Sequence, residues 1–535
     1  MNAPEAIRAA LMEAARRLGA PVQDVILERP KDTSHGDLAA NLALTLAKAL
    51  KAKPRDVAQQ LVDGLELPVG VVRKTEIAGP GFINFFLAEQ ALASVIPVVI
   101  EAGARYGRGA GTGNPVNVEF VSANPTGPLH VGHGRQAALG DGIASLLEWT
   151  GWKVSREFYY NDAGGQIERL TQSVIARLKG QEPAEDGYHG DYIREVAEAY
   201  GNKSPVPDDV RRFAVDYLRK EQDADLQAFG VKFDTYFLES SLYAHKKVDE
   251  TLQTLERAGH TYQEGGALWL KTTDFGDDKD RVLVRSAEKG GEPTYFVPDV
   301  AYHVDKWKRG FHRAINVQGA DHHSTVTRVR IGLQALDMGI PQGYPEYVLH
   351  QMVTVMKGGE EMKVSKRAGS YVTLRDLLDE VGRDAVRYFF LMRKSDSHFV
   401  FDVDLAKRQT EENPVYYVQM AHARMSGIFR VAGRDPVSVL PSGVDLAVLT
   451  QPDEVEILKD LAEFPKVVQG AAESLEAHRI ATYLEKLAGE THAWYHKYRV
   501  LGEPEEAARL LLARAIRQVL ANGLALAGIS APDRM

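Results

Sequence analysis

Two histidines three residues apart form the first candidate catalytic site in this sequence. His130 and His133 belong to the stretch SANPTGPLHVGHGR, residues 122–135, which lies between a strand-like and a helix-like segment. Gly132 and Gly134 let a phosphorylated ligand approach the backbone, and a helix N-terminus offers free N–H donors. Two imidazole donors on one helical face can stabilise charge at the α-phosphate of a nucleotide during adenylyl transfer. A tight turn with two surface histidines is the simpler alternative.

Two lysines form the second candidate site. Lys363 and Lys366 belong to the stretch KVSKR, residues 363–367, in a glycine-rich and charged loop that follows another apolar strand-like segment. Cations on a loop suit a leaving pyrophosphate, because they must bind it and then release it. Taken alone, the stretch is typical of a basic loop in solvent. Paired with the histidine motif, it predicts a site that binds nucleotide phosphates.

Composition limits the class of protein that must position these residues. The chain has 535 residues, 44% of them apolar and 26% charged, which is typical of a multidomain globular protein and not of a disordered chain. It has no cysteine, which excludes disulfides, thiolate metal sites and a cysteine nucleophile. A net charge of −9 argues against a uniformly basic nucleic-acid coat, although it leaves room for a local basic groove. Without a leader or an 18-residue apolar run, we expect a cytoplasmic protein without a membrane partner.

Hydrophobic periodicity predicts an N-terminal α+β domain over residues 1–108. Amphipathic helices are expected within residues 1–50, the second of them across residues 38–50. Strands are expected at residues 71–77 and 82–87, on either side of a Gly-Pro-Gly turn. A run rich in glycine follows and marks the boundary of the domain.

Residues 109–400 alternate strands and helices, which predicts a Rossmann-type parallel sheet. The expected strands of this catalytic core lie at residues 116–121, 153–159, 314–317 and 347–352. Residues 181–290 are polar and rich in helix, with a hairpin near their end, and we interpret them as an insertion between two halves of the sheet. Residues 401–535 predict a separate all-α helical bundle. The fold class is therefore multidomain α/β.

The two motifs resemble the HIGH and KMSKS motifs of class I aminoacyl-tRNA synthetases, and the whole chain resembles the bacterial arginyl-tRNA synthetases in particular. Val364 and Arg367 depart from the second motif, but both of its lysines are kept. Further similar stretches occur in the same order along the chain, at residues 34–41, 119–127, 160–164, 417–424 and 528–535.

The resemblance implies an ATP-dependent ligase that joins L-arginine to tRNA(Arg) through an arginyl-adenylate and releases AMP and diphosphate. It implies ATP with Mg²⁺ as a substrate, no prosthetic group, a monomer, and arginine activation that requires bound tRNA. His130, His133, Lys363 and Lys366 are the implied catalytic residues. The implied ATP-binding residues are His130, Gly132, His133, Gly319, Asp321, His322, Met352, Val353 and Lys366. No protein metal site is expected, because the adjacent His322 and His323 point apart.

The resemblance also implies a pocket for the arginine substrate. A guanidinium is a planar, permanently charged group that binds carboxylates, and an α-ammonium group needs hydrogen-bond acceptors. The implied arginine-binding residues are Glu119, Asn124, His130, Tyr295, Asp299 and Gln318. Family members can carry glutamine directly before the equivalent of Asp321; here that position is Ala320, and Gln318 lies two residues earlier.

For tRNA, the resemblance implies that the N-terminal domain contacts the D-loop through Phe82 and Asn84 and that the C-terminal helices bind the anticodon. Without the family, Phe82 and Asn84 are alternate positions on a strand. A small-molecule nucleotidylyltransferase shares the histidine motif but does not need the two terminal domains. A tRNA-binding paralogue without activity would not need both motifs. Another class I specificity remains open, although Glu119 and Asp299 favour a cationic amino acid.

Overall fold

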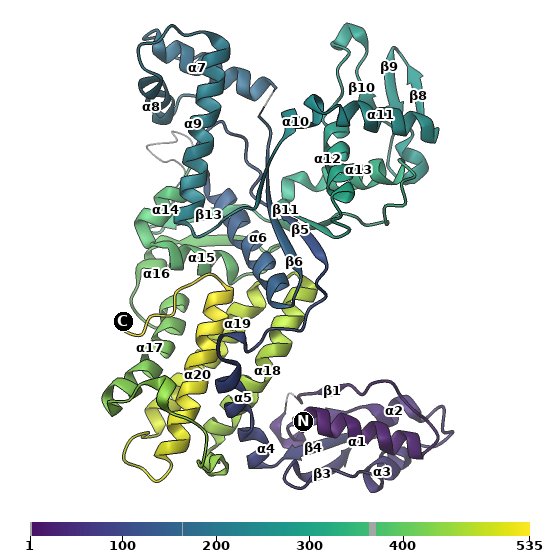
Figure 1. Cartoon of the computed structure of the whole chain (residues 1–535), viewed down its shortest axis with the longest axis vertical. Coiled ribbons are helices and arrows are strands. Elements are labelled where there is room, and N and C mark those ends of the chain that lie inside the picture. Colours follow the sequence, from purple (N-terminus) through teal and green to yellow (C-terminus); the bar gives the residue numbers. More distant parts are fainter. Residues whose placement is uncertain (1–2, 31, 163, 363–370) are drawn as a thin grey trace.

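The computed structural model describes residues 3–30, 32–162, 164–362 and 371–535. Figure 1 shows an elongated molecule in which a central parallel sheet stands between two lobes at one end and a helical bundle at the other. The N-terminal α+β domain lies beside the far end of that bundle (Figure 1). Lys363 and Lys366 lie outside the described residues, as does the rest of the 363–370 segment.

The N-terminal domain packs three helices against an antiparallel sheet with the strand order β1-β2-β4-β3. The helices are α1 (Ala3–Arg17), α2 (Leu42–Leu46) and α3 (Pro54–Asp63), and the strands are β1 (Leu27–Glu28), β2 (Leu38–Ala40), β3 (Val72–Ala78) and β4 (Phe82–Leu87). The helix expected across residues 38–50 is wrong at its start. Leu38 and Ala40 pair with β4 and bury alternate side chains, so this part of the chain follows the two-residue period of a strand.

The catalytic core is a five-stranded, all-parallel sheet with the strand order β12-β11-β5-β6-β7. The strands are β5 (Pro115–Glu119), β6 (Lys153–Tyr160), β7 (Thr235–Leu238), β11 (Ala314–Gly319) and β12 (Glu346–His350). From β5 the chain continues through helix α6 (Val131–Trp149) to β6 on one side, whereas β11 lies on the other side of β5. The strand order therefore reverses next to β5, and ligands of such sheets bind at the carboxyl ends of the strands at this point.

One strand of this sheet, β7, lies inside the 181–290 segment that we expected to be an insertion. It pairs in parallel with β6, so it separates two structural additions to the core. The first is a helical lobe of α7 (Gly165–Leu178), α8 (Asp191–Tyr200) and α9 (Pro207–Ala228). The second contains α10 (Glu239–Ala244), α11 (Lys247–Ala258) and the antiparallel strands β8 (Thr261–Glu264), β9 (Ala267–Leu270) and β10 (Arg281–Val284). Figure 1 shows these additions on opposite sides of the sheet.

The chain returns to the core through helices α12 (Phe296–Lys308) and α13 (His323–Gln334), which pack against each other. A small second sheet follows, with the order β14-β13-β15, made of β13 (Val353–Lys357), β14 (Glu360–Glu361) and β15 (Phe399–Asp402). Helices α14 (Leu374–Val381) and α15 (Arg383–Leu391) separate β14 from β15 in the sequence. α15 packs on α6, the helix that follows the histidine motif.

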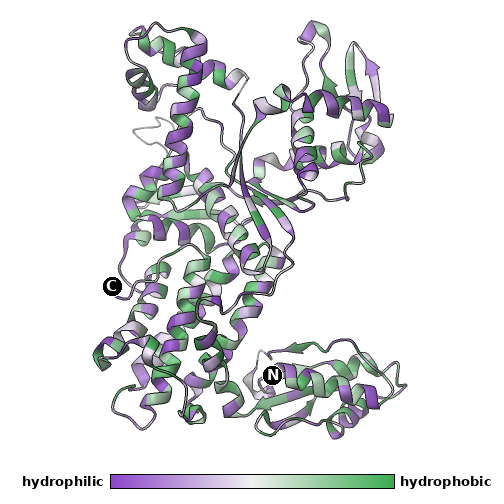
Figure 2. Ribbon diagram, in the orientation of Figure 1, coloured by the Kyte–Doolittle hydropathy of each residue, from purple (hydrophilic) through white to green (hydrophobic). Residues whose placement is uncertain are grey.

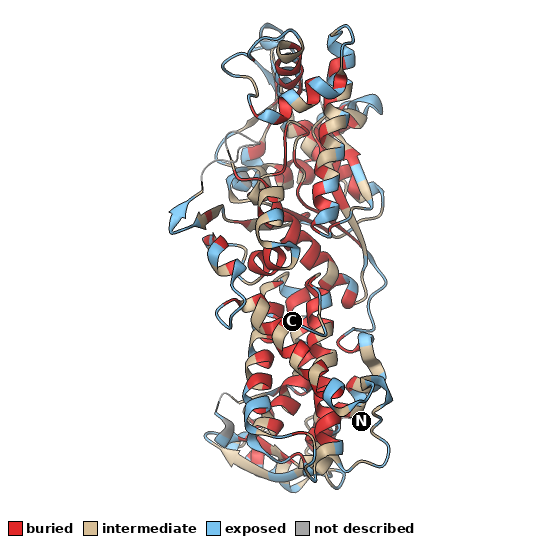
Figure 3. Ribbon diagram, turned by 90° about the vertical axis from the view of Figure 1, so that its left-hand side faces the viewer, coloured by how far each residue is buried: buried red, intermediate tan, exposed pale blue. Residues whose placement is uncertain are grey.

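The C-terminal bundle consists of helices whose apolar faces meet in one core (Figures 2 and 3). They are α17 (Pro414–Ala432), α18 (Pro452–Ser474), α19 (His478–Lys497) and α20 (Glu506–Leu526). The short helix α16 (Val403–Lys407), which precedes them, packs on α14, α15 and β13. The N-terminal domain contacts α18 through ion pairs of Arg29 with Glu456 and Asp460 and of Asp37 with Lys459. Within the described chain, no helix is both long and apolar enough to cross a membrane.

One of the contacts between the catalytic core and the C-terminal bundle is made by a buried guanidinium. Arg387 of α15 donates to Asp141 of α6 at 2.5 Å and to the carbonyl of Ala527, just beyond α20, at 3.0 Å. We expect Arg387→Met to lower the free energy of unfolding by about 1–3 kcal/mol, because the carboxylate of Asp141 keeps only Arg156 as a partner and the carbonyl of Ala527 loses its donor. Urea unfolding measures this change. Arg383→Met, an exposed arginine on the same helix, is the control, and equal effects of the two substitutions would contradict the prediction.

Candidate active site

The histidine pair caps the N-terminus of α6. His130 is the N-cap residue; its Nδ1 accepts the backbone N–H of His133, and Nδ1 of His133 accepts the backbone N–H of His130, both at 3.3 Å. The two rings stack with centroids 3.6 Å apart. A Cβ atom at Gly132 would lie 2.9 Å from Cε1 of His130, so glycine is required where the rings stack. The expected strand, loop and helix thus place both imidazoles at the end of the sheet.

Both imidazoles are neutral hydrogen-bond donors near pH 7. Because each Nδ1 accepts a backbone N–H, the proton of each neutral ring is on Nε2. Burial lowers the pKa of His130, against the opposing charge of Asp321. Burial, helped by His130 and His350, lowers the pKa of His133 well below its usual value. The site therefore presents two Nε2–H donors that need no added proton.

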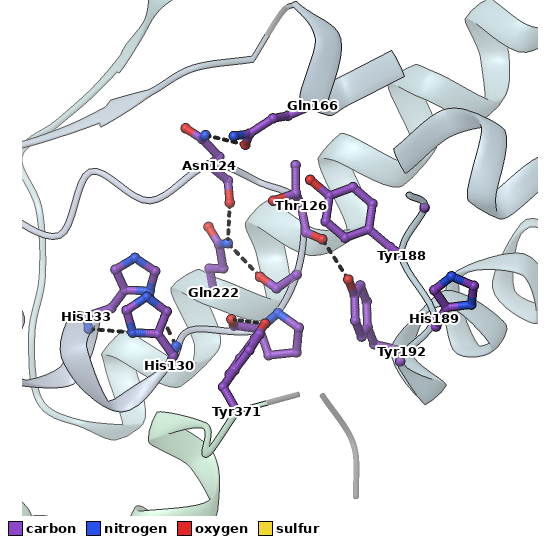
Figure 4. A pocket seen from close by; sticks show the side chains of 14 residues that line it. Asn124, Thr126, His130, His133, Gln166, Tyr188, His189, Tyr192, Gln222 and Tyr371 are labelled. Atoms are coloured by element: carbon purple, nitrogen blue, oxygen red, sulfur yellow. Dashed lines mark hydrogen bonds between the residues drawn. The ribbon is translucent and has the colours of Figure 1, made fainter. Parts of the chain in front are cut away.

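A cavity of about 670 Å³ opens beside the histidine pair. Its walls come from the loop before α6, from the helical lobe and from the segment directly before α14. Figure 4 shows the lining side chains, which include Asn124, Thr126, His130, His133, Gln166, Tyr188, His189, Tyr192, Gln222 and Tyr371. The ring of Tyr371 meets the ring of His130 edge to face, with centroids 5.7 Å apart. The cavity is large enough for several polar ligand groups and is rich in hydroxyl and amide side chains.

The other residues expected to bind ATP lie at the carboxyl ends of β11 and β12. Gly319 ends β11, and Asp321 and His322 lie in the 3₁₀ turn Ala320–His322 that follows. A Cβ atom at Gly319 would lie 2.4 Å from Oδ1 of Asp321, so any other residue here would displace the Asp321 carboxylate. Met352 is 71% exposed, and Val353 begins β13.

Arg135 fixes the segment before Met352. It is fully buried, two residues after His133, and donates to the carbonyls of Gln351 at 2.9 Å and Lys394 at 3.1 Å. Beside it, burial lowers the pKa of His350 to about 4. His350 was not among the expected site residues, although it ends a core strand. The histidine helix and the expected adenine-binding segment are thus held together by direct contacts.

Three carboxyl groups gather at the carboxyl ends of β5 and β7. Glu119 ends β5, Glu239 directly follows β7, and Asp299 lies in the first turn of α12. Burial, together with Glu239 and Glu119, raises the pKa of Asp299 to about 8. Burial also raises the pKa of Glu239, which accepts a hydrogen bond from the hydroxyl of Tyr159 at 2.8 Å. Such a cluster favours a cation among the three groups.

Glu119 is already paired with a buried cation. Nζ of Lys306, which is fully buried, donates to Oε2 of Glu119 at 2.6 Å and to Oδ1 of Asn316 at 3.1 Å. The hydroxyl of Ser122 donates to the other carboxylate oxygen at 2.9 Å. Sequence analysis missed both Glu239 and Lys306. A short strand followed by glutamate, at residues 235–239, is the signal that could have found Glu239.

The remaining expected arginine-binding residues come from the start of α12, the end of β11 and the loop after β5. Tyr295 is 66% exposed at the N-cap position of α12. Oε1 of Gln318 is buried near the end of β11 and has no hydrogen-bond partner in the described part of the chain. Nδ2 of Asn124 donates to Oε1 of Gln166 at 2.6 Å. Gln318 and Asn124 therefore offer amide groups on the same edge of the sheet as the carboxyl groups.

The two residues expected to contact tRNA differ in exposure. Phe82 and Asn84 lie at alternate positions of β4, as expected for one face of a strand. Phe82 is 37% exposed, whereas Asn84 is 3% exposed. Asn84 pairs with Ala39 of β2 and Glu76 of β3 in the sheet. Of the two, only Phe82 presents a substantial surface.

Three family models match the chain in succession. Residues 2–87 match the arginyl tRNA synthetase N terminal domain, residues 95–426 match the catalytic domain of the class I (R) tRNA synthetases, and residues 418–535 match the DALR anticodon binding domain. The second model alone covers more than half of the chain.

Named relatives are similar along nearly their full length. The arginine–tRNA ligase of Geobacter metallireducens is 56% identical over 96% of this chain and 95% of its own length. That of Bordetella parapertussis is 54% identical over 99% of this chain and 98% of its own. Among solved structures, the arginyl-tRNA synthetase of Thermus thermophilus is 26% identical, with a TM-score of 0.77 over 99% of this chain and all of that one.

Proposed function

This chain belongs to the arginyl-tRNA synthetase family of class I aminoacyl-tRNA synthetases, and from this membership we propose how its residues ligate L-arginine to tRNA(Arg) with ATP. The observation that carries the proposal is the carboxyl cluster beside the capped histidine pair. It combines a site for a substrate cation with donors for a nucleotide phosphate. ATP is bound with Mg²⁺ as a substrate.

The arginine side chain lies among the three carboxyl groups. Lys306 pairs with Glu119, so Asp299 and Glu239 remain as partners for the guanidinium, and the charge of Glu119 adds to their field. Tyr295 covers the side chain from the exposed rim of the pocket. The oxygens of Asn124 and Gln318 accept hydrogen bonds from the α-ammonium group, as His130 contacts the carboxylate end.

Adenylation is a displacement at the α-phosphate. A carboxylate oxygen of arginine forms a bond to phosphorus, and the bond from phosphorus to the pyrophosphate oxygen breaks. The Nε2–H groups of His130 and His133 donate to the α-phosphate oxygens, where negative charge develops. Lys363 and Lys366 bind the leaving pyrophosphate. Because no enzyme nucleophile is needed, positioning and charge stabilisation supply the rate enhancement.

In the second step, a ribose hydroxyl of the terminal adenosine of tRNA attacks the carbonyl carbon of the adenylate. The bond from that carbon to the phosphate oxygen breaks, AMP leaves, and the hydroxyl proton passes to solvent. Residues 1–108 contact the D-loop side of the tRNA through the exposed ring of Phe82, beside the buried Asn84, residues 109–400 catalyse both steps, and residues 401–535 bind the anticodon. We propose that the enzyme acts as a monomer in the cytoplasm.

The affinity for arginine should increase with pH up to about 8. The raised pKa of Asp299, about 8, means that its carboxyl group is mostly protonated at pH 7 before arginine binds. The guanidinium favours the ionised form, so binding releases a proton below pH 8, and affinity rises at most about tenfold for each pH unit. Calorimetry with the tRNA-bound enzyme, in buffers of different ionisation enthalpy, measures the released proton. Affinity that stays constant from pH 6.5 to 8.5 would contradict the proposal.

Pyrophosphate exchange tests the proposed reaction. Radiolabelled pyrophosphate should enter ATP only when arginine is present, since exchange requires a reversible adenylate. Assays with and without tRNA(Arg) test the implied requirement for tRNA. Exchange with arginine in the absence of tRNA would show that tRNA is not required, but it would still support the proposed ligase reaction. Failure of exchange under both conditions would reject the proposed intermediate.

A further inference from the structure

We propose that Gln222 and Tyr192, in the helical lobe α7–α9, are positioning residues for adenylation. They hold the backbone of the loop that connects Glu119 with the histidine pair. The inference rests on the proposed function, because it assigns these side chains a part in the same reaction. On this proposal, the helical lobe contributes to catalysis by positioning residues of the core.

The loop begins with a strained backbone. Val121 and Ser122 have φ angles of 70° and 42°, in the left-handed region that side chains with a Cβ atom disfavour. For valine the penalty is largest, because its branched Cβ crowds the following carbonyl. Such strain persists only where the surrounding structure holds the backbone in place. Some contacts must therefore prevent this loop from relaxing.

Side chains from the lobe supply those contacts. Nε2 of Gln222 on α9 donates to the carbonyl of Asn124 at 3.0 Å and to that of Gly127 at 2.8 Å. The hydroxyl of Tyr192 on α8 donates to the carbonyl of Thr126 at 3.0 Å. Figure 4 shows both side chains reaching the loop from the helical lobe. Two side chains thus hold the carbonyls of three of the four residues 124–127. Both side chains come from helices that lie more than sixty residues later in the sequence.

Buried contacts attach the helical lobe to the core near Gln222 and Tyr192. Gln222 and Tyr192 are 1% and 3% exposed, so water does not compete for their hydrogen bonds. One turn further along α9, the buried Asp225 pairs with Arg375 of α14 at 2.6 Å. α14 begins directly after Thr373, whose backbone bridges to His130. The lobe and the histidine motif therefore share one rigid frame.

The positions of Asn124 and of the histidine pair depend on this loop. The carbonyl of Asn124 accepts a hydrogen bond from Gln222, and its side chain is one of the proposed arginine contacts. The same loop continues directly into His130, the N-cap residue of α6. If the hydrogen bonds from Gln222 are lost, the buried carbonyl of Gly127 loses its donor, the carbonyl of Asn124 keeps only the N–H of Thr126, and the loop can relax. Displacements of about 1 Å at reacting groups lower rates by about 10²-fold. The expected defect is therefore in turnover more than in substrate binding.

The test compares variants of Gln222 in arginine-dependent pyrophosphate exchange with tRNA present. Gln222→Met keeps the length of the side chain but removes its donors. We expect kcat to fall about 10- to 100-fold at every pH, with much smaller changes in KM for ATP. Gln222→Glu can donate only when its carboxyl group is protonated, so its activity relative to wild type should rise as the pH falls from 8.5 to 6. Gln227→Met, an exposed glutamine on the same helix, should match wild type.

Each outcome decides the proposal. A Gln222→Met enzyme whose kcat stays within about twofold of wild type would overturn it, as would a Gln222→Glu enzyme whose relative activity does not change with pH. If thermal melting shows that Gln222→Met does not fold, Tyr192→Phe decides instead. This variant loses one hydroxyl group, and kcat should fall about 3- to 10-fold if the loop needs it. A wild-type enzyme without exchange would reject the proposed function and not this inference alone.

Discussion

Replacing Asp299 with asparagine should lower kcat/KM for arginine by about 10²–10³-fold at pH 8, because the guanidinium loses a charged and largely desolvated partner. Asparagine has nearly the shape of a protonated aspartate but cannot ionise. The substitution therefore keeps residue 299 neutral, as Asp299 mostly is at pH 7 before arginine binds. The KM for ATP should change little, because Asp299 belongs to the arginine side of the site. Steady-state arginylation of tRNA measures both parameters.

The neutral analogue citrulline provides the sharper comparison. Wild-type enzyme should strongly prefer arginine to citrulline, and the Asp299→Asn variant should lose most of that preference. Asp274→Asn, an exposed aspartate of the same lobe, is the control and should match wild type. An Asp299→Asn enzyme that retains wild-type kcat/KM for arginine would remove this residue from the pocket.

Replacing His133 with asparagine should lower the rate of adenylation by about 10²–10³-fold. Asparagine keeps an acceptor near the position of Nδ1 and so keeps the helix cap, but it lacks the Nε2–H donor. Glutamine instead places an N–H group near Nε2 and should recover part of the rate. Single-turnover formation of the adenylate, followed with radiolabelled ATP, measures the effect.

Thermal melting separates this catalytic loss from a loss of the cap, which is worth about 1 kcal/mol. His133→Asn should melt close to wild type although it is nearly inactive. If glutamine is no better than asparagine, the Nε2–H donor has no part in catalysis. At saturating arginine, adenylation by the wild-type enzyme should also stay unchanged from pH 8.5 to 6.5, because the lowered pKa keeps His133 neutral over this range.

The sequence contained enough information for the main sheet and for the histidine site. β5, β6, β11 and β12 all contain β-branched or aromatic residues, and helices separate them in the sequence, so each could be recognised as a strand from the local sequence. His130 and His133 could be predicted as a pair because a strand, glycines and a helix surround them within a few residues. Such local signals depend on the chain alone.

The parts that were missed depend on tertiary contacts. β7 has only four residues, so its period is too short to distinguish it from the polar segment around it. Leu38 lies at helical spacing from Leu42 in the sequence, but pairing with β4 makes residues 38–40 a strand. Glu239, Lys306 and Gln222 become site residues only when elements distant in sequence meet at the end of β5. No local spacing marks Lys306 or Gln222, and the only local signal for Glu239 is its place directly after the short strand β7.

The most direct test of the central claim is the charging of unfractionated tRNA with each of the twenty radiolabelled amino acids, in the presence of ATP and Mg²⁺. The predicted result is acid-precipitable label with arginine alone, and none when ATP is omitted. Charging with a different amino acid would show that the carboxyl cluster selects another substrate. Charging with none of the twenty would contradict the assignment of this chain as an active arginine–tRNA ligase.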